Sequence, residues 1–310
     1  MRWIETDDSR DPARNLALEE WCVRNLDPTP GYLLLYVNGP AVVVGTNQNV
    51  HREVDLAWTR ARGVPVLRRI SGGGTVYHDP GNLNFSVMRP FRPGTKLDFD
   101  AYLEPVARAL RTLGIPAERT ARNDLTIGGR KISGNAQFTT VRSMFSHGTL
   151  LFDADLDAVR ASLDTDGEGI ETRAVESRRS PVTNIRPHLP RPIDLITFRE
   201  RFAYAMLEGS TDPGPVRLDD DAWSEIDRLA DTRYRTWEWT YGRAPRFTVR
   251  RSLEPLPGAP VVTLEVEHGV ISAARIAVGG DRRRLGHLLA HLTGARYERD
   301  ALREALDRAG

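Results

Sequence analysis

Residues 68–87 read RRISGGGTVYHDPGNLNFSV. Three consecutive glycines (72–74) lie between two β-rich runs, 64–70 and 83–89, which we expect to pair as strands. Glycine has no Cβ, so its backbone N–H groups can approach and surround phosphate oxygens. The sequence therefore predicts an anion-binding turn between two strands.

The residues that flank the glycines strengthen this interpretation. Arg68 and Arg69 end the preceding strand, where their charge could neutralise a phosphate or a carboxylate. A bare glycine run is more often a flexible loop, but Ser71, His78 and Asn82 add polar groups that such a loop does not need. The pattern GxxxxGK followed by Ser or Thr is absent from the stretch, which argues against a P-loop nucleotidase.

A second glycine-centred stretch, NDLTIGGRKISGNAQ, covers residues 123–137. It predicts a hairpin with its turn at Gly128 and Gly129, which places Asp124 and Lys131 close together on facing strands. Asp124 could hold a Mg²⁺ ion that bridges phosphates. The alternative is an exposed ion pair, which would contribute little to stability.

Lysine usage favours a functional site at this hairpin. Of 43 basic residues, 41 are arginine, and only Lys96 and Lys131 are lysine. Arginine is a planar fork, whereas lysine is a compact charge on a flexible stem. A lysine kept in so arginine-rich a chain indicates chemistry that arginine cannot supply.

Two further stretches carry polar groups that are less specific on their own. SHGTLLF (146–152) puts His147 at the entrance to a strand, where a lone histidine is more often structural than catalytic. ESRRSPVTNI (176–185) lies in a long loop, 164–192, that is rich in Gly, Pro, Arg and Ser. Long loops inside compact domains are usually functional or mobile, so this one could fold over a bound anion.

The remaining pattern indicates an α+β chain in two parts. In the first part, apolar spacing predicts helices at 11–26, 54–62, 99–113, 153–163, 195–209 and 219–231, and strands at 31–38, 41–45, 135–141 and 147–153. A hairpin turn is expected at 38–39 and a loop at 46–53. Beyond residue 236 we expect strands at 247–252, 261–267 and 270–277 and helices near 282–293 and 298–308. A module of this size is marginal alone and should pack on the main body.

Composition and charge exclude several classes of protein. The formal net charge is only +1 at pH 7, so the chain lacks the basic surface of a general nucleic-acid-binding protein. It contains no run of about 18 apolar residues, so we expect no membrane span. The N-terminal stretch is polar, and the sole cysteine, Cys22, can form neither an intrachain disulfide nor a cysteine zinc site. These features are typical of a cytoplasmic protein.

Taken in order, five motifs resemble those of the lipoate–protein ligase A family: the Arg-Arg pair with SGGGTVYHDPGNLN, then ND with GRKISGNAQ, HGTLLFDADL, VTN and WEWTYGRAPRF. The resemblance runs from about residue 10 to the C-terminus. It implies an α+β fold, in which residues 1–236 form a mixed β-sheet catalytic domain of the biotin/lipoate ligase (class II synthetase-like) type. That domain would bind lipoate and the adenylate, and residues 237–310 would form a small α+β accessory domain.

The resemblance also implies roles for individual residues. Lys131 would be the catalytic residue, in contact with the acid's carboxylate and the adenylate phosphate, and Asp124 would bind the metal ion. The expected ATP- and adenylate-binding residues are Arg69, Gly74, Thr75, Val76, Tyr77, Asn123, Lys131, Ser177, Thr183 and Asn184. The expected lipoate-binding residues are Ser71, Gly72, Gly73, His78, Lys131, Gly134 and His147.

The activity that the resemblance implies is ligation of lipoate with ATP and Mg²⁺. A carboxylate is a poor electrophile, so lipoate would first react with ATP to give lipoyl-AMP and pyrophosphate. A lysine of a lipoyl carrier domain would then take the acyl group and release AMP. The carriers would be acyltransferase subunits of 2-oxoacid dehydrogenases or the glycine cleavage H protein, with no nucleic acid and no membrane involved.

Two alternatives stay open at this point. One is an octanoyltransferase of the same fold, whose cysteine-using members form a thioester. Here Cys22 lies in an expected amphipathic helix, where a small buried side chain is the simpler interpretation. The other is a non-catalytic lipoate- or adenylate-binding protein, which the presence of Lys131 and Asp124 argues against. A biotin ligase is disfavoured because its GRGRxGR-type loop is missing.

Overall fold

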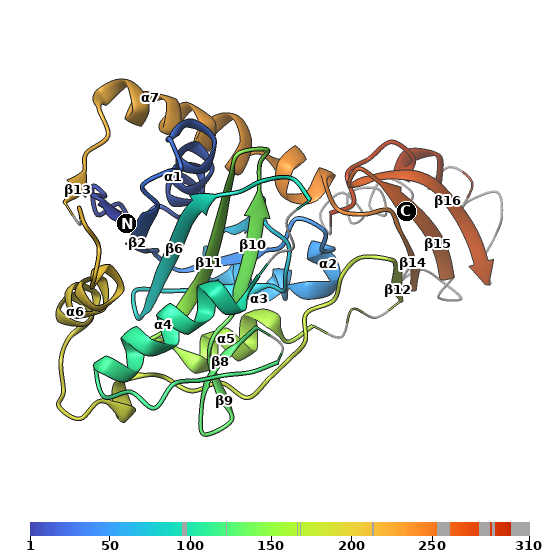
Figure 1. Ribbon diagram of the computed structural model, residues 1–310. Coiled ribbons are helices and arrows are strands. Elements are labelled where there is room, and N and C mark those ends of the chain that lie inside the picture. Colours follow the sequence, from blue (N-terminus) through green and yellow to red (C-terminus); the bar gives the residue numbers. More distant parts are fainter. Residues whose placement is uncertain are drawn as a thin grey trace.

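A mixed six-stranded sheet forms the centre of the computed structural model (Figure 1). Its order is β10-β11-β6-β2-β1-β13. The strands, in that order, are Asn135–Thr139, Ser143–Leu151, Asn82–Pro90, Tyr32–Val37, Arg2–Ile4 and Pro215–Val216. The structure describes residues 1–94, 98–121, 123–165, 167, 169–212, 214–252, 261–278, 286 and 289–298.

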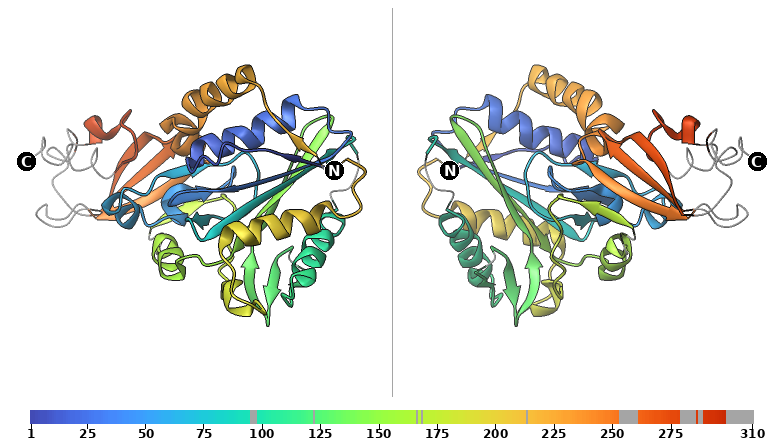
Figure 2. Two further views of the ribbon diagram at one scale, coloured as in Figure 1. Left: turned by 90° about the vertical axis from the view of Figure 1, so that its left-hand side faces the viewer. Right: turned by 90° about the vertical axis from the view of Figure 1, so that its right-hand side faces the viewer.

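Helices cover both faces of this sheet. Figure 2 shows α1 and α7 on one face and α4 and α6 on the other. The α-helices are α1 (Pro12–Asn25), α2 (Val50–Glu53), α3 (Leu56–Ala61), α4 (Asp100–Thr112), α5 (Leu156–Leu163), α6 (Leu195–Leu207) and α7 (Asp220–Leu229). The structure also has a 3₁₀ turn, η1 (Arg186–His188), and two π-helical turns, η2 (Ala230–Tyr234) and η3 (Glu238–Gly242). Residues 286 and 289–292 are helical as well. None of these helices is long and apolar enough to cross a lipid bilayer.

The alternation of residues along β6 explains why the two faces of the sheet differ. Leu83, Phe85 and Val87 point to one face and are buried in the core that includes α4 and α6. Burying each such side chain stabilises the fold by roughly 1.5–3 kcal/mol. Asn84 and Ser86 occupy the alternate positions and point to the other face, where they are also buried. The sheet therefore has one apolar face and one face with a polar zone.

A second sheet, in the order β4-β3-β5, corrects the expected pairing around the glycines. Its strands are Val66–Arg68, Ala41–Val44 and Val76–His78. The predicted pairing of residues 64–70 with residues 83–89 is wrong. Strand β4 pairs with β3, and strand β6 pairs with β2 and β11. The glycine turn leads into β5, a strand of three residues that is too short to show a period of two.

Two neighbouring predictions are also wrong. The expected hairpin at 38–39 does not form, because β2 and β3 belong to different sheets and the Gly39 N–H donates to the Arg10 carbonyl. Residues 50–53 form the short helix α2 and not a loop. The Asn49 side chain caps this helix by accepting the N–H of His51 at 2.9 Å.

The hairpin at 123–137 is confirmed. β8 (Leu125–Ile127) pairs antiparallel with β9 (Arg130–Ser133), and β7 (Glu118–Arg119) adds a third strand. The turn residues Gly128 and Gly129 have φ of 54° and 75°, the left-handed conformation that glycine adopts without strain. This turn places Lys131 one residue into the returning strand.

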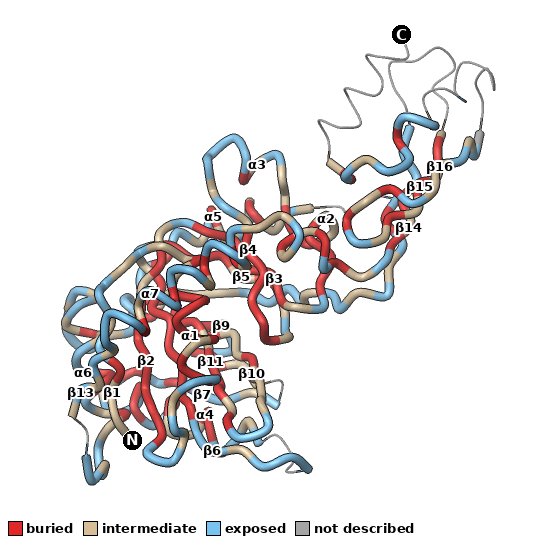
Figure 3. Tube along the Cα trace, turned by 90° about the horizontal axis from the view of Figure 1, so that it is seen from above, coloured by how far each residue is buried: buried red, intermediate tan, exposed pale blue. Residues whose placement is uncertain are grey.

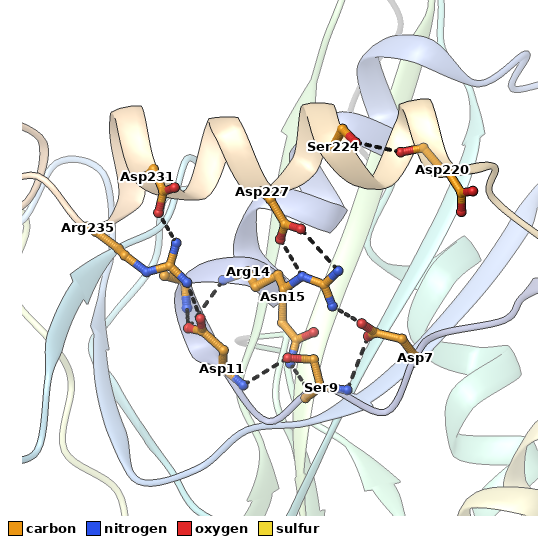
Figure 4. A network of polar contacts seen from close by, with 11 residues as sticks. Asp7, Ser9, Asp11, Arg14, Asn15, Asp220, Ser224, Asp227, Asp231 and Arg235 are labelled. Carbon is orange, nitrogen blue, oxygen red and sulfur yellow. Dashed lines mark hydrogen bonds and ion pairs between the residues drawn. The ribbon is translucent and has the colours of Figure 1, made fainter.

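Charged side chains join α1 to α7 (Figure 4). Arg14 of α1 lies between Asp7 and Asp227, and Arg235 lies between Asp11 and Asp231 of the turn η2 that follows α7. Asp11 also caps α1, where its carboxylate accepts the N–H groups of the first turn. These pairs are partly exposed, and such pairs typically contribute about 1 kcal/mol or less each. They help to fix α1 over the polar face of the sheet.

Arg68 is fully buried and binds only backbone carbonyls among the described residues. Its Nη1 donates to Gly45 and Gln48 at 2.8 Å, and its Nη2 donates to Thr240 at 2.6 Å. In return, the Trp239 ring nitrogen donates to the Arg68 carbonyl at 2.7 Å. The suggestion that Arg68 faces a phosphate is wrong: it joins the second sheet to the π-helical turn η3.

A separate sheet lies at one end of the molecule (Figures 1 and 3). Its order is β12-β14-β15-β16, with strands Ile170–Thr172, Phe247–Ser252, Val261–Glu267 and Val270–Val278. The three predicted C-terminal strands are confirmed, whereas the helices expected after residue 278 lie largely outside the described residues. The long loop 164–192 supplies β12, so it carries more regular structure than expected. The boundary at 236–237 stays a prediction.

Candidate active site

Two adjoining cavities share part of their walls. The larger one measures about 530 Å³ and extends along β5, β11 and α5. The smaller one measures about 300 Å³ and extends over the polar zone of the central sheet towards α1. The residues that line both cavities are Thr75, Val76, Lys131, Gly134, Thr149, Glu176, Ser177, Arg178 and Ser180. These residues mark the place where the two cavities join.

Lys131 lies at this junction, on β9. Its Nζ is 2.8 Å from Asp124 Oδ1, so the predicted convergence of the two residues is confirmed. A Cβ on Gly134 would come within 3.2 Å of Lys131 Cε and Nζ, so the ammonium packs directly against this glycine. The Lys131 backbone pairs with the loop, donating to Pro181 and accepting from Thr183. Both the backbone and the side chain of Lys131 are therefore held in place.

Arg69 shapes the glycine turn. Its Nη2 donates to the carbonyls of Gly72 at 2.6 Å and Gly74 at 2.7 Å, and its Nη1 donates to Val43 at 3.1 Å. Gly73 between them has φ of 86°, a conformation that a side chain would strain. A Cβ on Gly45 of the neighbouring strand end would meet the Gly73 carbonyl at 2.2 Å. The turn thus needs glycine at both places.

Ser177 anchors the long loop against this turn. Its Oγ accepts the Thr75 N–H at 2.8 Å and a Gln48 side-chain N–H at 2.9 Å. Its own N–H donates to the buried carboxylate of Glu53 at 3.1 Å. The loop therefore crosses the junction of the two cavities and is held there by the end of α2.

A buried polar chain runs through the wall of the smaller cavity. Glu19 of α1 accepts from His147 Nδ1 at 2.9 Å, and His147 Nε2 lies 2.7 Å from Ser71 Oγ. In the neutral ring, with the proton on Nδ1 donated to the carboxylate, Nε2 accepts the Ser71 hydroxyl proton. Arg69 Nε completes the chain by donating to Ser71 at 3.0 Å. The Tyr36 hydroxyl also bonds to Glu19.

His78 has one ring nitrogen without a partner among the described residues. Its Nδ1 accepts from the Asn38 side chain at 2.8 Å, which puts the proton on Nε2, and Nε2 is buried and unpaired. Burial and the nearby charge of Arg69 lower the pKa of His78 to about 3, so the ring is neutral at pH 7. His78 lines the smaller cavity and offers a donor that the protein leaves unused.

The structure brings most of the predicted site residues to the cavities. Those that line at least one cavity are Arg69, Gly73, Gly74, Thr75, Val76, Tyr77, His78, Asp124, Lys131, Gly134, His147 and Ser177. Those that line neither are Ser71, Gly72, Asn123, Thr183 and Asn184. Both polar ends of the Asn184 side chain bind the backbone of Ala154, at 3.0 Å and 2.9 Å. The binding roles themselves stay predictions.

Sequence reasoning missed several residues of the site. Glu19 had a detectable signal, because it stands in the buried stripe of α1 near Leu16 and Val23, where a charge is out of place unless it is paired. Gln48 and Glu53 had no such signal in the sequence. Residues 46–53 show no periodic pattern, and both side chains act in the site only through their contacts with Ser177.

The geometry defines an enzyme-like site in which two ligands can meet beside one lysine. In a comparison of folds, a putative lipoate protein ligase from T. acidophilum with bound lipoic acid matches with a TM-score of 0.66 and 26% identity. That match covers 78% of this chain and 98% of the other. A lipoate-protein ligase A bound with ATP matches with a TM-score of 0.66 and 25% identity, over the same shares. The fold is thus that of the lipoate ligases.

Sequence comparison agrees with this class. The model of the lipoyl protein ligase A/B catalytic domain matches residues 11–207. The lipoate-protein ligase LplJ of Bacillus subtilis is 39% identical over 314 residues, which cover 99% of this chain and 94% of that protein. The chain belongs to the lipoyl protein ligase A/B family. The resemblance found in the motifs is therefore confirmed.

Proposed function

We propose that this chain activates lipoate with ATP and transfers the lipoyl group to a lysine of a carrier domain, as a lipoate–protein ligase. The observation that carries the proposal is the position of Lys131, which lines both cavities where they join. A lipoate carboxylate in the smaller cavity and the α-phosphate of ATP in the larger one would meet beside its ammonium. Membership of the family supports the same activity.

The lining of each cavity suits the ligand assigned to it. The larger cavity has an apolar wall from Tyr77, Leu151 and Leu163, which suits a flat nucleobase. The smaller cavity combines apolar side chains such as Leu16 and Val43 with the polar chain described above. A short acyl chain with a polar end fits such a lining.

The first step needs no nucleophile from the protein. A lipoate carboxylate oxygen attacks the α-phosphorus, the bond to the β-phosphate breaks, and pyrophosphate leaves with the electron pair. Negative charge gathers on the phosphate oxygens, where Lys131 and the N–H groups of Gly73 and Gly74 can stabilise it. In the second step the carrier amine attacks the activated carbonyl and AMP leaves.

Magnesium fits this site as a companion of ATP. Asp124 lines the smaller cavity next to Lys131, and its side chain is only 20% exposed. No cluster of three or more His, Cys, Asp or Glu suited to a metal occurs among the described residues. Mg²⁺ commonly takes one or two protein carboxylates and fills its other positions with phosphate and water. Asp124 would hold the ion, which would neutralise part of the phosphate charge.

We propose lipoyl carrier domains as the partners, in acyltransferase subunits of 2-oxoacid dehydrogenases or in the glycine cleavage H protein. Acyl transfer to a lysine requires a carrier whose lysine can reach the junction of the cavities. The cytoplasm is the proposed compartment, since the chain has a single cysteine, which the structure keeps as a buried free thiol.

The direct test measures pyrophosphate release with lipoate, octanoate and biotin as separate substrates. We expect release with lipoate, together with lipoyl-AMP, and none with biotin. Release with octanoate as well would mean that the smaller cavity accepts several acyl chains. No release with any of the three acids would refute ATP-dependent activation.

Cys22 provides a test against the octanoyltransferase alternative. The thiol is 1% exposed in the core between α1 and the central sheet, lines neither cavity, and has its pKa raised by burial. We therefore expect Cys22→Ala to keep transfer activity within about twofold and to lose about 1 kcal/mol of stability. An inactive but folded variant, with an acyl group found on Cys22 of the wild type, would support the alternative.

The loop over the junction is expected to gain order when the intermediate binds. Polar contacts hold this loop and none of residues 176–184 is buried, so its opening should expose little apolar surface and cost little free energy. Lipoyl-AMP must be shielded from water until the carrier arrives. Hydrogen exchange across residues 176–184 should therefore slow when a non-hydrolysable lipoyl-adenylate analogue is added. Equal exchange in both samples would identify the loop as a static segment.

A further inference from the structure

Five cationic side chains line the larger cavity, and four of them have partners. Lys131 pairs with Asp124 and Arg52 with Glu176 at 2.9 Å. The other two of these four are Arg160, which is 3.2 Å from Asp157, and Arg179, which donates to the Leu163 carbonyl at 2.7 Å. The fifth is Arg178, for which no hydrogen bond or ion pair occurs within the described part of the chain.

Both neighbours of Arg178 in the chain are held by other residues, Ser177 through its backbone and hydroxyl and Arg179 through its guanidinium. Ser177 before it is held by Thr75, Gln48 and Glu53, as described above. Arg179 after it binds the carbonyl groups at the end of α5. Arg178 therefore extends from a fixed point of the loop, although its side chain is exposed. It lines both cavities, so its charge is available where they join.

The reaction creates a need for charge at this place. As the carboxylate attacks the α-phosphorus, the electron pair of the breaking bond moves onto the oxygen that leaves with the β-phosphate. Lys131 already pairs with Asp124, and in the proposed mechanism it contacts the lipoate carboxylate and the α-phosphate. A guanidinium offers two parallel N–H donors to phosphate oxygens and keeps its charge at all relevant pH values.

We propose that Arg178 binds the β- and γ-phosphates of ATP and stabilises pyrophosphate as the leaving group. The proposal rests on the proposed function, because it concerns the adenylation step alone. No proton is transferred in this step, and no atom of Arg178 forms a covalent bond. An exposed cation beside the junction of the cavities also suits a product that must leave to solvent.

The test uses the full chain as wild type, Arg178→Gln and the matched control Arg173→Gln. Arg173 is an exposed arginine of the same loop that lines neither cavity, so the control removes the same charge nearby. Two half-reactions are measured separately: lipoate-dependent exchange of pyrophosphate into ATP, and transfer from preformed lipoyl-AMP to an apo carrier domain. The inhibition constant of pyrophosphate is measured in the forward reaction.

We expect Arg178→Gln to slow the exchange reaction by about 10²-fold, the effect of losing one donor to a developing anion. The inhibition constant of pyrophosphate should rise by at least tenfold, whereas transfer from lipoyl-AMP and all properties of Arg173→Gln stay at wild-type values. An unchanged inhibition constant, or an equal loss of the transfer reaction, would overturn the role of Arg178. A wild type that catalyses neither half-reaction would instead refute the proposed function, and this inference with it.

Discussion

Lys131→Ala is expected to lower lipoyl-AMP formation by about 10³-fold without unfolding the protein. The ammonium lies at the junction of the two cavities, 2.8 Å from Asp124, where the carboxyl and phosphate charges would come together. The backbone bonds of residue 131 to Pro181 and Thr183 do not depend on the side chain, so the loop keeps this anchor. Adenylate formation is measured by chromatography and folding by circular dichroism.

Lys131→Arg is expected to be nearly as inactive. The lysine Nζ and Cε pack 3.2 Å from the position of a Cβ on Gly134, so the wider, planar guanidinium would have to shift away from this glycine and from the place of the ammonium. Lys131→Met serves as the control, since it keeps the length of the side chain and removes only the charge. If Lys131→Arg made lipoyl-AMP at close to the wild-type rate, the assignment of Lys131 as the catalytic residue would be wrong.

Arg68→Met is expected to lower the free energy of unfolding by at least about 3 kcal/mol, because several buried carbonyls would lose their donor. Gly45, Gln48 and Thr240 are the acceptors at 2.9 Å or less. Burial lowers the pKa of Arg68 to about 10, which still leaves the guanidinium charged at pH 7. The measurement is the midpoint of denaturant unfolding.

The controls for Arg68 separate its geometry from its charge. Arg68→Lys keeps the charge but cannot reach carbonyls on opposite sides, so it should recover only part of the stability. Arg108→Met alters an exposed arginine on α4 and should change the free energy of unfolding by no more than about 0.5 kcal/mol. A stable Arg68→Met variant would show that η3 is held to the second sheet by other contacts.

Much of the fold could be predicted from local patterns. The hairpin with Gly128 and Gly129 was predictable because its turn chemistry and strand periodicity agree. The C-terminal strands were predictable because each has six residues or more, and because buried and half-buried residues alternate along the whole of β15. The strand pairing around the glycine turn was not predictable, because β5 has only three residues and its partner β3 lies more than 30 positions earlier in the chain.

The candidate site also contains some residues that the sequence could predict and others that it could not. Motifs led to Lys131, Asp124 and the glycine turn because these residues lie in short, dense stretches. Glu19, Gln48 and Glu53 join the site through contacts with residues 124 to 129 positions away, and such contacts leave no local trace in one sequence. The buried position of Arg68 was missed because its neighbour Arg69 carries the same charge in the same motif.

Strand β12 connects the C-terminal sheet to the loop that crosses the junction of the cavities. Its last residue, Thr172, is paired with Phe247 of the C-terminal sheet, and Ser177 at the junction of the cavities follows five positions later. Five residues of extended chain reach no further than about 18 Å. A large displacement of the C-terminal sheet must therefore carry the loop with it, release Ser177 or separate β12 from β14. A ligand that changes the contacts of Ser177 would therefore also bias the placement of the sheet, and the placement of the sheet would bias the binding of that ligand by the same free energy.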